Sequence, residues 1–277
     1  MSLRFVKMNG LGNDFVIVPT DVLPFEPRPD QVRALAGRVS GIGCDQVIAI
    51  TPSDCAHAGM RIWNADGDEV EHCGNAVRCV SWLMMRALGL DQVRVETPSG
   101  VLRAHRDGSW GVTVDMGEPR LGWRDIPLAW EIDTREIRLP FDEALGAPGC
   151  VSMGNPHVTF FVPDATTTKA ETLGPVIERH WLFPRRVNVG FAQIVRPDRI
   201  RLRVWERGAG LTKACGTGAC AAVVAAQRRG LCDRRAVVEM DGGELWVDWS
   251  EADNHVRMTG PVSVEFTGYL PPMEIAA

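Results

Sequence analysis

Two cysteines, Cys73 and Cys215, lie 142 residues apart, and each is followed by a glycine. The same offset aligns residues 61–64 (Arg-Ile-Trp-Asn) with residues 203–206 (Arg-Val-Trp-Glu), and each cysteine comes nine positions after its segment. Cysteine and tryptophan account for only eight and nine of the 277 residues, so chance explains both coincidences poorly. The pattern indicates a duplicated domain with one thiol in each half. Two thiols on opposite sides of a carbon could take a proton from one face and return a proton to the other.

Amide side chains recur at the same offset. Gly12-Asn13 aligns with Gly154-Asn155, and Gln46 aligns with Asn188. A single asparagine beside an apolar strand is usually a turn residue. A set that is aligned across a repeat instead favours a hydrogen-bonding cage for a polar ligand. The set consists of Asn13, Gln46, Asn64, Asn155 and Asn188. Glu206 and Arg207 add one charge of each sign, which suits an ammonium and a carboxylate.

Each cysteine directly precedes a segment that is apolar on nearly every face. Residues 74–88 and 217–229 are both predicted to be buried central helices, which end at Gly89 and Gly230. A helix start offers unpaired N–H groups and the positive end of the helix dipole, which together can hold a carboxylate. The same field is expected to lower the pKa of both cysteines.

The remaining pattern predicts a two-domain α/β (α+β) protein in which each domain is a mixed β-sheet wrapped around a central helix. Runs rich in Val, Ile and aromatic residues predict the strands 15–18, 46–50, 60–63, 92–97, 112–115, 158–162, 190–195, 199–205, 236–240, 244–247 and 262–266. The predicted pseudo-symmetric domains are residues 1–118, joined by a C-terminal strand within 264–277, and residues 119–263. Residues 124–140 are expected to add an extra pair of strands to the second half.

Composition excludes several classes of function. The net charge of −5 argues against a nucleic-acid partner or an anionic membrane surface. The N-terminus shows no signal peptide, and no run of 18 apolar residues could span a bilayer, so a cytoplasmic protein is expected. The eight cysteines contain no Cys-x-x-Cys pair, which favours reduced thiols over disulfides and makes a structural zinc site a weak interpretation. No metal site is therefore expected.

The other six cysteines have simpler interpretations. Cys79 and Cys220 fall inside the apolar helices, which predicts positions in the core. The remaining four have no partner of the same type in the repeat, and a structural role is expected for Cys44, Cys55, Cys150 and Cys232.

The chain resembles the diaminopimelate epimerases nearly from end to end. The motifs that carry the resemblance are Gly10-Leu11-Gly12-Asn13-Asp14-Phe15, Asn64-Ala65-Asp66-Gly67, Glu71-His72-Cys73-Gly74-Asn75, Gly154-Asn155-Pro156-His157, Glu206-Arg207-Gly208 and Ala214-Cys215-Gly216-Thr217-Gly218-Ala219. The resemblance implies a pyridoxal-independent enzyme without a cofactor. Such an enzyme interconverts LL- and meso-diaminopimelate for lysine and peptidoglycan precursor synthesis. It also implies two similar domains with the site in the cleft between them, and often a homodimer.

The resemblance also implies roles for individual residues. Cys73 and Cys215 become the acid–base pair, and His157 and Glu206 become groups that tune the thiols. The implied substrate-binding residues are Asn13, Gln46, Asn64, Gly74, Asn75, Asn155, Asn188, Glu206, Arg207, Gly216 and Thr217. The chain departs from the family pattern at three positions: His72 stands where Gln is usual, Ala76 where Gly is common, and Cys44 where a smaller residue is frequent.

Two other functions stay open at this point. A proline or hydroxyproline racemase-type isomerase would use the same pair of thiols, although Glu206-Arg207 and the amide set favour a longer substrate with a second charged end. A thiol redox sensor would need two cysteines but no polar cage. Only three lysines are present and no pyridoxal signature is visible, so an imine electron sink is not expected. His157 suits a core position and a site position about equally.

Overall fold

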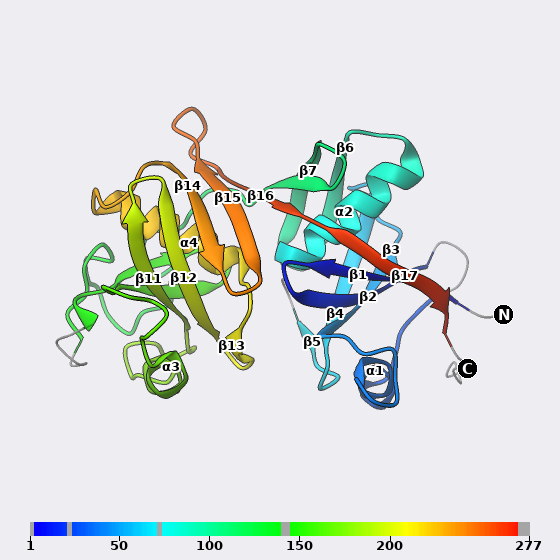
Figure 1. The fold of residues 1–277 in the computed structure, drawn as a ribbon, viewed down its shortest axis with the longest axis horizontal. Coiled ribbons are helices and arrows are strands. Elements are labelled where there is room, and N and C mark those ends of the chain that lie inside the picture. Colours follow the sequence, from blue (N-terminus) through cyan, green and yellow to red (C-terminus); the bar gives the residue numbers. More distant parts are fainter. Residues whose placement is uncertain (1–2, 21–23, 71–73, 140–144, 271–277) are drawn as a thin grey trace. The chain divides into compact units, whose positions relative to one another are not determined.

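The computed structural model describes residues 3–20, 24–70, 74–139 and 145–270. Contacts divide the chain into two compact units, Met1–Val114 with Gly260–Ala277, and Asp115–Thr259. We call them unit 1 and unit 2. The chain passes from one unit to the other within β8 (Gly111–Asp115) and again within β16 (Val256–Pro261). Both units combine a mixed β-sheet with two helices (Figure 1).

Unit 1 is built around α2 (Gly74–Leu88). Its strands are β1 (Arg4–Gly10), β2 (Asn13–Pro19), β3 (Gln46–Thr51), β4 (Ala58–Asn64), β5 (Glu69–Val70), β6 (Gln92–Thr97), β7 (Gly100–Asp107) and β17 (Ser263–Tyr269). They pair in the order β17–β1–β2–β3–β4–β6–β7, with β5 added to β4. The β2–β3 and β4–β6 pairs are parallel and the others antiparallel. The strands β1, β2, β6 and β7 all contact α2, and α1 (Pro29–Ala36) contacts β3.

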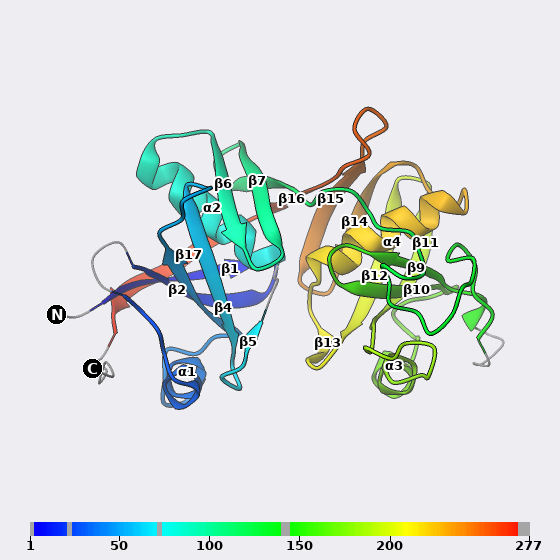
Figure 2. The same ribbon diagram turned by 180° about the vertical axis from the view of Figure 1, so that it is seen from behind.

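Unit 2 repeats this plan around α4 (Gly216–Arg228). Its strands are β9 (Gly149–Ser152), β10 (Pro156–Phe161), β11 (Asn188–Arg196), β12 (Arg199–Glu206), β13 (Gly210–Thr212), β14 (Arg235–Met240) and β15 (Gly243–Trp249). They pair in the order β9–β10–β11–β12–β14–β15–β16, with β13 added to β12. Again two pairs are parallel, β10–β11 and β12–β14. Figures 1 and 2 show strands curling around α4 on more than one side, while α3 (Ala170–Glu178) lies at the edge of the unit.

The duplication inferred from the sequence is confirmed by the strand registers. Phe15 pairs with Gln46 across β2 and β3, and His157 pairs with Asn188 across β10 and β11, at the same offset of 142. The two central helices also match their predictions: α2 has the predicted limits, and α4 begins and ends one residue earlier than predicted. The glycines predicted to end them have left-handed backbones, with φ of +68° at Gly89 and +67° at Gly230.

Burial decides most of the cysteine predictions. Cys79 and Cys220 are fully buried in the core, as predicted. Cys44, Cys150 and Cys232 are buried as well. Cys55 is exposed, with its sulfur 3.6 Å from the hydroxyl of Ser53, and a structural role for it stays a prediction.

The predicted extra pair of strands in residues 124–140 is also wrong. Over the described part of this segment, residues 124–139, the chain forms turns and irregular backbone. Its apolar side chains, such as Ile126 and Ile137, instead fill the core of unit 2. The backbone is held by single hydrogen bonds to other segments, for example from Ile137 N to Pro148 O at 2.8 Å. The segment therefore supplies apolar residues to the core without strand pairing.

Candidate active site

Three of the predicted amide residues of unit 1 lie at strand ends that meet. Asn13 begins β2, Gln46 begins β3 and Asn64 ends β4. Parallel pairing of β2 with β3 and antiparallel pairing of β3 with β4 place these ends at the same edge of the sheet, with Gln46 directly opposite Asn64. Gln46 Nε2 donates to Asn64 Oδ1 at 2.9 Å. The buried Gln46 Oε1 has no hydrogen-bond partner among the described residues, so it remains available to a ligand donor.

The start of α2 joins this edge through a chain of side-chain hydrogen bonds. Asn75 Nδ2 donates to Asn13 Oδ1 at 2.6 Å, and Arg78 Nη1 donates to Asn75 Oδ1 at 2.9 Å. Arg78 is fully buried in a largely apolar helix. Because the arginine uses the oxygen of Asn75, the amide nitrogen of Asn75 must point to Asn13. Gly74 and Asn75, predicted to cradle a carboxylate, are both buried in the first turn.

Cys73 lies outside the described residues, together with Glu71 and His72. The described chain resumes at Gly74, the first residue of α2. The sequence therefore places Cys73 immediately before the helix, and its role is a proposal taken up below.

Unit 2 gathers its predicted residues at the corresponding edge. Asn155 precedes β10, Asn188 begins β11 and Glu206 ends β12. Here the amide of Asn188 bonds to backbone: its Nδ2 donates to Pro156 O at 2.9 Å, and its Oδ1 accepts from Arg207 N at 2.8 Å. Asn188 therefore holds the strand ends together itself. The exposed Arg207 is oriented further by a hydrogen bond from its Nη1 to Arg185 O at 3.1 Å.

Cys215 is the residue that immediately precedes α4, with an extended backbone (φ −133°) and a buried side chain. Its Sγ lies 3.7 Å from Thr217 Oγ1. Burial raises the pKa of the thiol well above its usual value, and the negative charge of Glu206 raises it further. The Thr217 hydroxyl and the backbone N–H of Gly218 oppose this shift but do not cancel it.

The expectation that the helix start lowers the pKa of Cys215 is thus wrong. The helix-start N–H group does favour the thiolate, but removal of water and a neighbouring carboxylate outweigh it. In the isolated unit, Cys215 is a protonated thiol at neutral pH. It is accordingly suited to donate a proton rather than to accept one.

Glu206 is the partner that controls this thiol. Its carboxylate accepts a hydrogen bond from Thr212 Oγ1 at 2.5 Å and interacts with the thiol of Cys215. Burial raises the pKa of Glu206, and the two hydrogen bonds oppose the rise. Thr212 was not among the residues singled out from the sequence. Nothing in the sequence marked Thr212, because only the folded pairing of β13 with β12 brings it close to Glu206.

His157 is linked to Cys215 through two other side chains. Its Nε2 lies 3.0 Å from Asn155 Oδ1, and Asn155 Nδ2 donates to Thr217 Oγ1 at 3.3 Å. Thr217 in turn contacts the sulfur. The buried histidine therefore orients Asn155 and, through Thr217, the thiol. It joins the site while occupying a core position in β10.

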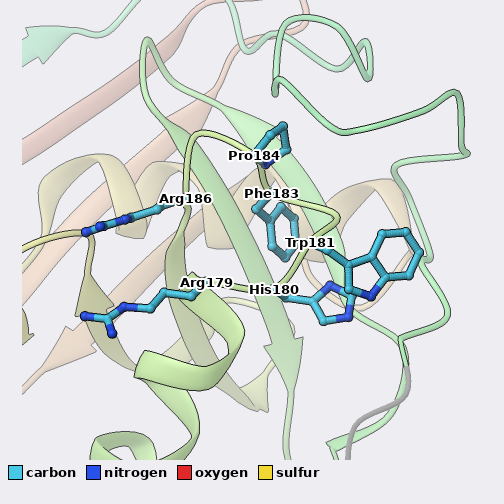
Figure 3. Close-up of a pocket in the computed structure, with 6 residues that line it drawn as sticks. All are labelled: Arg179, His180, Trp181, Phe183, Pro184 and Arg186. Atoms are coloured by element: carbon cyan, nitrogen blue, oxygen red, sulfur yellow. The ribbon is translucent and has the colours of Figure 1, made fainter.

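One surface pocket of unit 2 lies apart from these residues. It measures about 440 Å³ and is lined by Arg179, His180, Trp181, Phe183, Pro184 and Arg186. Figure 3 shows Arg179 and Arg186 extending to one side and His180 and Trp181 to the other. None of the residues predicted for catalysis or substrate binding lines it, so it is not the candidate active site.

The described residues contain no group of three or more His, Cys, Asp or Glu side chains that could hold a metal ion. No described helix is both long enough and apolar enough to cross a membrane.

Comparison with known proteins agrees with the motifs in both units. A family model described as diaminopimelate epimerase matches residues 5–122 and 149–265. The chain is 61% identical over 274 residues to a diaminopimelate epimerase of Phenylobacterium zucineum, covering 98% of this chain and 99% of that protein. It is 54% identical over 289 aligned positions to a diaminopimelate epimerase of Caulobacter vibrioides, covering 100% of both.

Solved structures of low sequence identity share the fold. A predicted epimerase from Pseudomonas aeruginosa superposes with a TM-score of 0.71 at 18% identity, covering 98% of this chain and 100% of that one. A hydroxyproline epimerase from Agrobacterium vitis, solved with trans-4-hydroxy-L-proline, gives a TM-score of 0.67 at 14% identity, covering 97% and 92%. At these identities the likeness establishes the architecture alone.

Proposed function

Since the chain belongs to the diaminopimelate epimerase family, we propose that it interconverts LL- and meso-diaminopimelate by proton transfer between two thiols, without a cofactor. The reaction would serve lysine and peptidoglycan precursor synthesis. The observation that carries the proposal is the surroundings of Cys215: a buried, protonated thiol at a helix start, held by Glu206 and Thr217. The duplicated sequence puts Cys73 at the same place before α2.

In this mechanism Cys73 and Cys215 act on opposite faces of the α-carbon. One thiolate removes the α-proton and becomes a thiol, while the other thiol donates its proton to the opposite face and becomes a thiolate. The raised pKa of Cys215 makes it the donor at rest, which leaves Cys73 as the base. The roles exchange when the reaction runs in reverse.

The α-hydrogen is a very weak acid, so charge that develops on the carboxylate must be stabilised. The backbone N–H groups at Gly74-Asn75 and Gly216-Thr217 would bind this carboxylate at the two helix starts. Exclusion of water around the buried Cys215 strengthens these interactions. No electron sink besides these donors enters the proposal.

The remaining polar residues would hold the substrate. The free Gln46 Oε1 can accept from an ammonium, and Glu206 and Arg207 carry one charge of each sign for a second amino-acid end. The proposed set is Asn13, Gln46, Asn64, Asn155, Asn188, Glu206 and Arg207. A second charged end is what separates diaminopimelate from proline, and proper orientation of that end would contribute to the rate.

The proposal extends to organisation. Residues 1–118 with 264–277 would form one half and residues 119–263 the other, and each half would contribute residues to the substrate site. The partner would be the small-molecule substrate, with a second copy of the chain in a homodimer. A cytoplasmic location fits the need to keep two thiols reduced.

A stereochemical assay in D₂O tests the function. Purified protein is incubated with LL-diaminopimelate, and both stereoisomers are quantified over time with their deuterium content. Each face has its own base, so deuterium should appear early in the meso product and slowly in recovered substrate. Conversion of proline or hydroxyproline, but not of diaminopimelate, would instead support the racemase alternative. Early meso product that carries mostly the original hydrogen would refute the two-thiol mechanism.

A further inference from the structure

Asp45 connects the ends of three strands in unit 1. Its backbone N donates to Asp14 O at 2.9 Å, and its Oδ2 accepts from Asp14 N at 2.8 Å. Its backbone O accepts from Ala65 N at 3.1 Å. Asp14, Asp45 and Ala65 are the immediate neighbours of Asn13, Gln46 and Asn64 in the sequence. Asp45 therefore fixes the backbone next to every amide of this edge.

Arg38 bridges the two carboxylates of this arrangement. Its Nη1 donates to Asp14 Oδ2 and its Nη2 donates to Asp45 Oδ1, both at 2.7 Å. Burial of Asp14 opposes ionisation, yet hydrogen bonds from Arg38 and Asn9 and the charge of Lys7 leave the pKa of Asp14 lowered. Asp14 is therefore charged at neutral pH. Without the guanidinium, two carboxylates would face each other at the strand ends, and Lys7, 3.7 Å from Asp14, would remain as a compensating cation.

The turn after α1 presents Arg38 to this edge. Lys7 Nζ donates to Gly43 O in the same turn, and Gly43 has a left-handed backbone with φ of +78°. A Cβ on Gly43 would lie 3.3 Å from the Cα of Arg38, so the turn is packed closely against the arginine. Backbone hydrogen bonds from Ile42 and Gly43 to Leu35 O close the turn. The position of the guanidinium is thus set by the fold.

The corresponding positions of unit 2, 142 residues later, hold no such group. Asp14, Arg38 and Asp45 correspond to Pro156, His180 and Val187. There the side chain of Asn188 ties the strand ends together instead.

We propose that Arg38, Asp14 and Asp45 form a clamp that positions Asn13, Gln46 and Asn64 for substrate, so that the amide groups need not hold the strand ends themselves. Arg38 is a positioning residue and touches no substrate atom. The inference rests on the proposed function. It gives a physical reason for the arrangement of the strand ends that carry the proposed substrate-binding amides of unit 1. It accounts for a contrast within the described part of the chain, where Gln46 Oε1 accepts no hydrogen bond while Asn188 Oδ1 accepts one from Arg207 N.

The test compares Arg38→Gln with Arg38→Lys and with the control Arg106→Gln. Arg106 forms an ion pair with Asp91 in the same unit, through a hydrogen bond of 3.0 Å, and is not among the proposed site residues. Arg38→Gln should lower kcat/KM for diaminopimelate about 10- to 100-fold, chiefly through KM, without moving the pH profile. Arg38→Lys should recover only part of this, because one ammonium replaces a two-pronged donor. The control should stay within about twofold.

Two further measurements separate positioning from folding. The side-chain amide NMR signals of Gln46 and Asn64 should shift in Arg38→Gln but not in Arg106→Gln. The double variant Arg38→Gln/Asp45→Asn should lose little more than either single variant, because both remove one shared contact. Unchanged amide signals, or unchanged KM in an active Arg38→Gln enzyme, would overturn the clamp. An inactive wild-type protein would overturn the proposed function, while the NMR result would still decide the clamp.

Discussion

The two units share strand order and register but hold their polar edges by different means. In unit 1 an arginine and two carboxylates fix the strand ends, and Gln46 Oε1 has no hydrogen-bond partner among the described residues. In unit 2 Asn188 performs the fixing with its own amide. The two units of a duplicated fold can therefore keep the same backbone while different side chains hold their strand ends. In unit 2 the amide of Asn188 makes two backbone contacts, whereas in unit 1 the Arg38 group ties the strand ends.

Residues near Cys215 in unit 2 also differ from the residues at the corresponding positions of unit 1. Asn64 of unit 1 corresponds to Glu206 of unit 2, and Phe15 corresponds to His157. The carboxylate of Glu206 raises the pKa of Cys215, while the same position in unit 1 is uncharged. A two-base reaction needs one thiol and one thiolate at the moment of binding. In the proposed mechanism, the charge of Glu206 next to Cys215, with an uncharged Asn64 at the corresponding position of unit 1, would provide this difference.

The largest expected effect comes from removing either thiol. Cys73→Ala and Cys215→Ala should each lower kcat for inversion by more than about 100-fold, within the 10²–10⁴-fold that acid–base groups typically contribute. The two losses should be similar despite the unlike surroundings, because each turnover uses both groups. Steady-state kinetics with circular dichroism to check folding would measure this. Turnover above about 1% in either folded variant counts against the pair.

Replacing the charge of unit 2 should show which thiol it controls. Glu206→Gln removes the negative charge that disfavours the Cys215 thiolate, so the pKa of Cys215 should fall. At a fixed pH between 7 and 8 the thiolate fraction then rises, and iodoacetamide should label Cys215 faster, as peptide mapping can show. Turnover should fall about 10- to 100-fold, because the proposed substrate contact of Glu206 and its hydrogen bond to the thiol are both altered.

The control for this experiment is Glu239→Gln, which alters a surface ion pair with Arg199 in the same unit. It should change neither the labelling rate nor turnover. Slower labelling of Cys215 in Glu206→Gln would contradict the claim that the charge of Glu206 raises the pKa of Cys215.

The sequence was sufficient for the parts of the fold that depend on regular burial. The limits of α2 and α4 followed from nearly unbroken apolar runs that end at glycines in left-handed conformation. The short helices α1 and α3 were missed, because eight or nine residues give few turns of periodicity and α3 contains Pro175. The 142-residue repeat likewise identified the amide residues as candidates for the site, but it did not predict their hydrogen-bond partners.

The polar details depended on tertiary placement that no spacing reveals. The predicted lowering of the Cys215 pKa considered only the helix start. The end of β12 brings Glu206 to the sulfur, and the surrounding core removes water. Arg38 is 24 residues from Asp14 and seven from Asp45, and only the pairing of β2 with β3 brings both carboxylates to it.

A smaller effect is expected where the units exchange an aromatic residue for a polar one. His157→Phe installs the residue that unit 1 has at position 15 and removes the contact with Asn155 Oδ1. Asn155 can then turn its amide, and Thr217 loses its fixed partner next to Cys215. We expect a loss of about tenfold in kcat, less than the full contribution of an acid–base group. An unchanged pH profile and unchanged kcat would show that His157 is only a core residue.

The smallest effect on activity, and one on stability, is expected at the contact between α3 and β12. Gly174 packs against Trp205, while the corresponding position of unit 1 holds Val32, which belongs to the same buried core cluster as Trp63. A Cβ at Gly174 would lie 2.4 Å from Trp205 Cγ, too close without movement of the helix. The indole of Trp205 cannot easily yield, because its Nε1 donates to the buried Glu178 at 2.8 Å.

Gly174→Ala should therefore lower the free energy of unfolding by about 1–3 kcal/mol, as overpacked cores do, with kcat within about twofold of wild type. The matched control is Gly37→Ala, since Gly37 has φ of −56° and its Cβ would meet other atoms only at 3.4 Å or beyond. That change should be neutral or stabilise by up to about 1 kcal/mol through the unfolded chain. Urea unfolding followed by tryptophan fluorescence measures both. Equal stability of the two variants would mean that α3 can move away from Trp205. The close contact of Gly174 with Trp205 would then contribute nothing to the stability of unit 2.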